Sequence, residues 1–242
     1  METHAHHLHK APGKNLWHYF FEFLMLFLAV FCGFLTENYR EHIVEHEREK
    51  QYMESMLQDL KQDNIQLKNI LNSFDTKLVF KDSLLMELTN PEIFKSSSRA
   101  YYFSQMSRHF LDFIYTDRTI QQLKNSGGMR LIRNKAVADS IIDYDSKVRT
   151  LFIGQQQMNS LALTFGLELN KIFKRRLMDV SNEGFQYPPI PLLSLNTADV
   201  EELYNNMTDQ KDGFNWLKAI EIDLLNRGEQ LSEFIKKEYH LE

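Results

Sequence analysis

The 242-residue sequence has little cysteine, proline or glycine: one cysteine, five prolines and nine glycines. A single cysteine, Cys32, cannot form an intramolecular disulfide and excludes a cysteine-based zinc site within one chain. The scarcity of helix breakers, with abundant Leu, Glu, Gln and Lys, favours long helices over a strand-rich fold. The net charge of -5 gives no general basic surface, so we expect no nucleic-acid partner.

The sequence also lacks the short motifs that indicate a reaction. It contains no HExxH, GxSxG or CxxC pattern and no acidic metal-binding loop. We therefore expect a protein that is not an enzyme and that needs no cofactor, although a catalytic set assembled from distant residues would leave no such motif.

The most apolar stretch covers residues 16–36, in a chain whose mean hydropathy is -0.41. Only His18 and Glu22 are polar before Thr36, and after Glu22 no polar helix face remains. As a helix the stretch would be about 31 Å long, the thickness of the hydrocarbon core of a bilayer. The composition therefore predicts a transmembrane helix over 16–36, with the lipid bilayer as its surroundings.

We do not expect this segment to be a cleaved signal peptide. Cleavage requires small side chains before the cut. The residues around Cys32 and Gly33 are bulky: Val30, Phe31, Phe34 and Leu35. The segment is therefore expected to remain as an anchor.

The basic residues beside the segment set its expected orientation. Lys10 and Lys14 precede it, and Arg40, Arg48 and Lys50 follow it. The positive-inside rule counts only Lys and Arg, so it separates the two orientations weakly. The nearer basic flank and the short N-terminal arm favour an N-terminus inside the cell and the large domain outside.

Glu22 allows three interpretations. It can extend back to the headgroups, paired with His18 one turn away, it can face another helix, or it can belong to a proton or ion path. A spacing of four and three residues places it on one helix face with Leu26, Ala29, Gly33 and Thr36. Ala29 and Gly33 form a small-xxx-small pair that lets two backbones approach closely, so we expect this face to contact another helix.

A helix is expected to continue through residues 37–90, because no proline or glycine lies between Gly33 and Pro91. A seam with a spacing of 3.5 residues runs through Met53, Leu57, Leu60, Asn64, Leu67, Leu71, Phe74 and Leu78. Two alternatives explain it: a bundle helix that packs on its own domain, or a coiled coil between chains. The contact residues of the second would be Met53, Leu57, Leu60, Asn64 and Leu67.

Residues 91–242 predict an antiparallel helical bundle into which residues 53–90 pack. We expect a short amphipathic helix within 101–115. Asp117 is expected to cap a helix that ends at Gly127, and Asn134 to cap one that runs to about Met178.

The end of the chain predicts two further helices. A proline-rich loop over 181–196 precedes a short helix from Asn196 or Thr197, and a last helix is expected from about Gly213 to Glu238. The fold class is thus all-α: a single N-terminal transmembrane helix that continues into a long stalk helix and a bundle, after an N-terminal arm over 1–15.

Three stretches carry a resemblance to a known family. The span begins with an acid and ends in "TENYRE", where the matching residues are Glu22, Asn38 and Tyr39. In "QYMESMLQDLKQD" (51–63) they are Tyr52, Leu57, Asp59, Leu60 and Asp63. In "QLKNSGGMRLIRN" (122–134) they are Leu123, Ser126, Gly127, Leu131, Ile132 and Asn134, followed by Tyr144.

In these stretches, which span the N-terminal two-thirds of the chain, the sequence resembles an uncharacterised family of single-pass bacterial membrane proteins, known only as a domain of unknown function. The resemblance implies a helical domain anchored in the inner membrane and facing the periplasm. It implies no activity.

Two local features could bind ligands. The histidines of the N-terminal arm could chelate a metal: His4, His6, His7 and His9. A flexible arm is a poor metal site, so we expect none there. Gly127 and Gly128, beside Arg130 and Arg133, could receive an anion, but a tight corner between helices with Leu131 and Ile132 inward is the expected structure.

The expected function is that of a membrane-anchored interaction or scaffold protein that acts through self-association or with another membrane protein. One alternative is a ligand-sensing helical domain that signals through a partner. Another is an accessory subunit of an ion-driven membrane machine in which Glu22 takes up a proton.

Overall fold

The computed structural model describes residues 16–94, 98–108, 110–173 and 196–241, and its regular elements are helices, which confirms the all-α class. The elements are α1 (Leu16–Leu88), the 3-10 helix η1 (Pro91–Phe94), α2 (Ser98–Ser107), α3 (Arg118–Asn125), the 3-10 helix η2 (Gly128–Leu131), α4 (Lys135–Ile172) and α5 (Thr197–Tyr239). The chain divides into two compact units, residues 1–49 and 50–242.

In the first unit, α1 begins at Leu16 and carries the apolar stretch. Its most apolar 18-residue window has a mean hydropathy of 2.0, and none of that window is buried. By length and composition, this helix could span a membrane.

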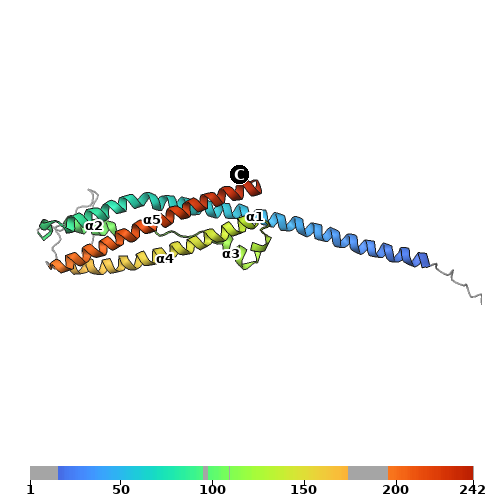
Figure 1. Cartoon of the computed structure of the whole chain (residues 1–242), viewed down its shortest axis with the longest axis horizontal. Helices are drawn as coiled ribbons and strands as arrows, with labels where there is room; N and C mark the ends of the chain where they lie inside the picture. Colours follow the sequence, from blue (N-terminus) through green and yellow to red (C-terminus); the bar gives the residue numbers. More distant parts are fainter. Residues whose placement is uncertain (1–15, 95–97, 109, 174–195, 242) are drawn as a thin grey trace, which may run out of the picture. The chain divides into compact units, whose positions relative to one another are not determined.

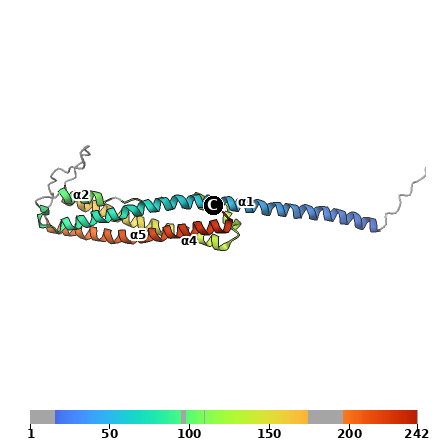
Figure 2. The ribbon, with the colours of Figure 1, turned by 90° about the horizontal axis from the view of Figure 1, so that it is seen from above.

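The second unit is a bundle of the later part of α1, α4 and α5. Figures 1 and 2 show these three helices side by side, with α5 antiparallel to both α1 and α4. Apolar side chains at spacings of three and four residues meet between them, because that spacing puts them on one face of each helix. On α1 the buried apolar residues are Met53, Met56, Leu60, Leu67, Ile70, Phe74, Leu84 and Leu88.

This buried stripe differs from the expected seam in one respect. The seam positions Leu57, Asn64, Leu71 and Leu78 are half-buried at its edge, and the centre of the stripe passes through Met56, Asp63 and Ile70. Sequence periodicity does not predict this centre, because it places polar residues such as Asp63 on the surface. The residue is in fact 1% exposed.

The last helix differs from its prediction. A single α5 replaces the two expected helices, with no break at Gly213. A Cβ atom at this glycine would lie 2.7 Å from the sulfur of Met158, so the missing side chain allows close packing against α4. Asn196 caps α5 by accepting from the backbone N–H of Ala198 at 3.1 Å, as one of the two expected starts required.

The helix predicted within 101–115 ends early. α2 stops at Ser107, and residues 110–117 run without helix to α3. Asn134 caps α4 as predicted, through the N–H groups of Ala136 and Val137. α4 ends at Ile172, earlier than the predicted end at about Met178, because the backbone of Phe173 is extended, with a φ of -110° and a ψ of 134°. Most of the proline-rich loop lies outside the described residues.

Candidate functional site

Two acids of α1 hold the start of α3 and the segment before it. Asp59, 2% exposed, accepts hydrogen bonds from Arg118 Nε at 3.1 Å, from Arg118 Nη2 at 2.5 Å and from the backbone N–H of Thr119 at 2.9 Å. Thr119 lies in the first turn of α3, where N–H groups have no partner within the helix. Asp59 therefore caps α3 from another helix.

This arrangement corrects the expected cap. Asp117 occupies the N-cap position, but its side chain makes no capping hydrogen bond. Its carboxylate instead accepts from the side-chain amide of Gln121 at 3.2 Å. The more buried Asp59 replaces it, because a carboxylate shielded from water makes stronger hydrogen bonds.

Asp63, one turn further along α1, connects three parts of the bundle. Its carboxylate accepts from the backbone N–H of Thr116 at 2.9 Å and from the hydroxyl of Tyr144 on α4 at 3.0 Å. Burial raises the pKa of Asp63 to about 6, although the hydrogen bonds from Thr116 and Tyr144 oppose the shift. We call Asp59, Asp63, Thr116, Arg118, Thr119 and Tyr144 the Asp59/Asp63 cluster.

Two lysines of α1 hold the other end of the same connection. Lys77 donates to the carbonyl of Met106 at 3.1 Å, and Lys81 donates to the carbonyl of Ser107 at 3.1 Å. Both carbonyls belong to the last turn of α2, where they have no partner within the helix and the helix dipole favours a cation. Acids thus meet a helix start and lysines meet a helix end.

The distance between the Asp63 and Lys81 contacts requires an extended chain between Ser107 and Thr116. From Asp63 to Lys81, α1 rises about 27 Å at 1.5 Å per residue. The nine residue-to-residue steps from Ser107 to Thr116 can cover at most about 31 Å. A helix over residues 110–115 would be too short, which explains why the predicted helix ends at Ser107.

Lys81 is buried in the core. It donates a second hydrogen bond to Oε1 of Gln210 on α5 at 3.2 Å, and its ammonium lies 5.2 Å from the ring centroid of Phe214. Burial, followed by the charge of Lys77, lowers the pKa of Lys81 to about 8.

Glu221 on α5 is the buried acid whose carboxylate oxygens have no hydrogen-bond partner among the described residues. Its side chain is 0% exposed, between Leu217 and Leu224 on the inward face. Burial, and next the charge of Asp112 in the 110–117 segment, raises the pKa of the Glu221 carboxyl to about 8. The sequence did not single out this residue, because one acid in an amphipathic helix gives no signal of its direction.

Residues from two of the three stretches that carried the family resemblance meet in this part of the fold, whereas Glu22, Asn38 and Tyr39 belong to the first unit. Asp59, Asp63 and Tyr144 belong to the Asp59/Asp63 cluster. Leu60, Leu123 and Ile132 lie in the core. Of the two residues predicted to point inward at the corner, Ile132 is buried and Leu131 is half-buried. Gly127 has a φ of 69°, which a glycine adopts without strain, and forms the corner between α3 and η2. The stretches 51–63 and 122–134 therefore belong to one structural unit.

The predicted membrane face is open in the structure. All five residues are exposed: Glu22, Leu26, Ala29, Gly33 and Thr36. A Cβ atom added at Gly33 would meet no atom within 4 Å, and the Thr36 hydroxyl donates to the carbonyl of Cys32 at 2.8 Å. Contact through this face stays a prediction. His4, His6, His7 and His9 lie outside the described residues.

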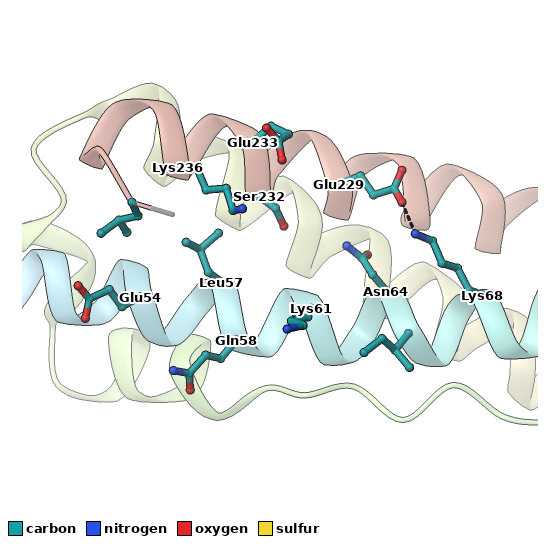
Figure 3. Close-up of a pocket in the computed structure, with 12 residues that line it drawn as sticks. Glu54, Leu57, Gln58, Lys61, Asn64, Lys68, Glu229, Ser232, Glu233 and Lys236 are labelled. Carbon is teal, nitrogen blue, oxygen red and sulfur yellow. Dashed lines mark ion pairs between the residues drawn. The ribbon is translucent and has the colours of Figure 1, made fainter.

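The predicted seam residues divide between the core of the bundle and a groove on its surface. Met53, Leu60 and Leu67 are buried in the chain's own core, as the bundle-helix alternative expects. Leu57 and Asn64 instead line a groove of about 870 Å³ between α1 and α5. Figure 3 shows this groove. The residues that line it are Glu54, Leu57, Gln58, Lys61, Asn64, Ile65, Lys68, Glu229, Ser232, Glu233, Lys236 and Leu241.

The chemistry of these two places differs. Asp59 and Asp63 are 2% and 1% exposed and accept hydrogen bonds that hold α1 to the start of α3 and to the segment before it. The groove is open and carries both charge signs. Within the part of the chain that the structure describes, no three His, Cys, Asp or Glu residues group as a metal site.

Comparison of the chain with protein-family models, with curated proteins and with solved structures finds no match.

Proposed function

We propose that this chain is a membrane-anchored interaction protein without enzymatic activity, a subunit of an oligomeric complex in the bacterial inner membrane. In this proposal residues 16–36 span the membrane, the N-terminus is cytoplasmic and the bundle lies in the periplasm. The family resemblance, with its implied anchor and periplasmic domain, supports this assignment.

The observation that carries the proposal is the uncovered apolar start of α1. Leu16, Met25 and Leu26 are 89%, 70% and 68% exposed. Such a surface on a soluble helix would associate or aggregate, whereas lipid covers it at no cost. Ala29 and Gly33 on one face of the segment suit close contact with a second helix.

The bundle supports an interaction role over catalysis. Its buried polar groups cap helices and connect elements, as Asp59 and Lys81 do. Its exposed features are an open groove of mixed charge and single apolar side chains. The groove is the feature through which we propose that the bundle contacts another protein.

Affinity purification of the full chain from its native membranes tests the proposal. We expect a second protein, or differently tagged copies of the same chain, to co-purify in mild detergent. Gly33→Leu should reduce recovery because it blocks close approach of two helices. Val30→Leu is the matched control, since Val30 is exposed on the same helix but lies off that face. A chain that purifies alone and monomeric would contradict the proposal.

A further inference from the structure

The groove between α1 and α5 carries charged side chains that the bundle itself does not pair. Three lysines and three glutamates line it. Lys68 and Glu229 form an ion pair of 2.7 Å. Glu54, Lys61, Glu233 and Lys236 have no ion pair with any described residue, although all four border one groove (Figure 3).

These charges follow a fixed order along the two helices. On α1, Glu54, Lys61 and Lys68 are seven residues apart and therefore share one face. Each of these three residues has a residue of opposite charge at the same height along the groove on α5. In Figure 3, Lys236 lies toward the Glu54 end of the groove and Glu229 opposite Lys68, with Glu233 between them. At each level of the groove, one helix thus offers a cation and the other an anion.

We propose that the groove is the interface with a second copy of this chain, packed in parallel about a two-fold axis along the helices. Such an axis places α1 of one copy against α5 of the other at the same level. Lys61 then faces Glu233 of the second copy, and Glu54 faces Lys236 of the second copy. The two symmetric contacts pair all four charges that the single bundle leaves unpaired.

The antiparallel arrangement fits worse. A two-fold axis across the helices would place α1 against α1 and α5 against α5. Near the middle of the groove Lys61 would then meet Lys61 and Glu233 would meet Glu233, although Glu54 would meet Lys68. The parallel pair instead opposes unlike charges at all three levels of the groove. Like charges in direct opposition destabilise an interface. The charge order therefore selects the parallel pair.

Apolar side chains in the groove would be covered by the same contact. Three apolar side chains line the groove: Ile65, which is 48% exposed, and the half-buried Leu57 and Leu241. Burying such side chains at the centre with charge pairs around them is the usual anatomy of a protein interface. This inference rests on the proposed function, since it names the partner as the chain itself.

Mixing two charge-reversed variants tests the interface. Lys61→Glu alone brings two carboxylates together where two identical copies meet, and Glu233→Lys alone brings two ammonium groups together. Each variant, as full chain in detergent or nanodiscs, should self-associate about tenfold more weakly than the unaltered chain. A mixture of the two differently tagged variants restores opposite charges between the copies, because each contact then joins one carboxylate and one ammonium group.

The two-fold axis determines which side chains meet in a pair made of one copy of each variant. In the mixed pair, one contact joins the two altered side chains, a carboxylate on α1 and an ammonium on α5, and the other joins the unaltered Lys61 and Glu233. Both contacts are therefore of opposite charge. The mixture should co-purify as well as two differently tagged unaltered copies.

The mixture separates contacts between chains from effects within one chain, because an altered single bundle cannot be repaired by another copy. Lys147→Glu on α4 and Asp209→Lys on α5, both outside the groove, are matched controls and should leave self-association unchanged. Thermal melting checks that each variant is folded.

Two results would overturn the inference. One is a mixture that associates no better than the single variants. The other is an unaltered chain that is monomeric at all concentrations. If a different protein co-purifies and is lost in both single variants and in their mixture, the groove binds that protein instead, and the proposed function stands without this interface.

Discussion

The early and late parts of α1 carry apolar side chains in different patterns. From Leu16 to Leu35 these side chains surround the helix, and all but the half-buried Leu24 are exposed. From Met53 to Leu88 most of them form one buried stripe in the core, and only single ones such as Val79 and Met86 are exposed. A helix that is apolar all round suits a lipid environment, and a one-sided stripe suits a protein core beside water. One continuous helix thus carries the sequence patterns of two environments.

The largest expected effect concerns the core half. Leu67 is 0% exposed, so Leu67→Arg places an unpaired charge in the bundle and should cost several kcal/mol, enough to abolish cooperative unfolding. Membrane association should persist, because it depends on the other half. Circular dichroism melting and membrane fractionation measure the two properties. Val79→Arg, at a position 61% exposed on the same helix, should change neither.

The converse change concerns the apolar half. Leu28→Arg puts a charge near the middle of residues 16–36 and should make insertion less favourable by about 3 kcal/mol. A glycosylation reporter of membrane insertion measures this cost, and bundle melting should stay unchanged. If Leu28→Arg instead lowered the melting temperature of the bundle, the two halves would not be independent.

A smaller effect is expected in the Asp59/Asp63 cluster. Asp59→Ala leaves the buried N–H of Thr119 without its acceptor and should lower the free energy of unfolding by about 2–3 kcal/mol, measured by denaturant titration. Asp75→Ala removes another acid of α1, one that pairs with Lys218 but is 81% exposed. It should cost less than about 1 kcal/mol.

The pH dependence of the bundle is expected to follow three buried ionisable groups. The folded pKa of Glu221 is raised from 4.5 to about 8, so stability falls as pH rises through that interval, and Asp63 adds to the fall up to about pH 6. The pKa of Lys81 is lowered from 10.5 to about 8 in the folded state, because burial disfavours its charged form. Stability therefore rises as pH increases from about 8 to 10.5. A minimum near pH 8 follows.

Denaturant titration across pH 5–10 checks this minimum. Glu221→Gln should flatten the fall between pH 5 and 8, because the amide does not ionise. Glu221→Leu should also raise stability at pH 8 by about 1–3 kcal/mol, since it removes an unpaired buried polar group. A steady rise of stability from pH 5 to 8 in the unaltered chain would contradict the buried, unpaired state of Glu221.

The sequence predicted the parts of this fold that depend on local pattern. Unbroken hydropathy marked the start of α1, three-and-four spacing marked the bundle helices, and Asn134 marked the start of α4. These features need only neighbours within one or two turns.

The remaining features depend on residues distant in sequence. Asp59 caps a helix that begins 59 residues later, and α5 continues through Gly213 because α4 packs there. The direction of Glu221 and the charge order of the groove arise only when α5 lies antiparallel to α1. Periodicity within one segment carries no information on such pairings.

Alkaline carbonate extraction of membranes that contain the full chain, followed by flotation, tests most directly whether the two parts of α1 have different surroundings. Carbonate releases proteins held by surface contacts and leaves integral proteins in the bilayer. We predict that the unaltered chain floats with the lipid and that protease, added from the side on which the bundle lies, leaves residues 16–36 protected. Release of the folded chain into the supernatant would contradict a membrane-spanning start of α1.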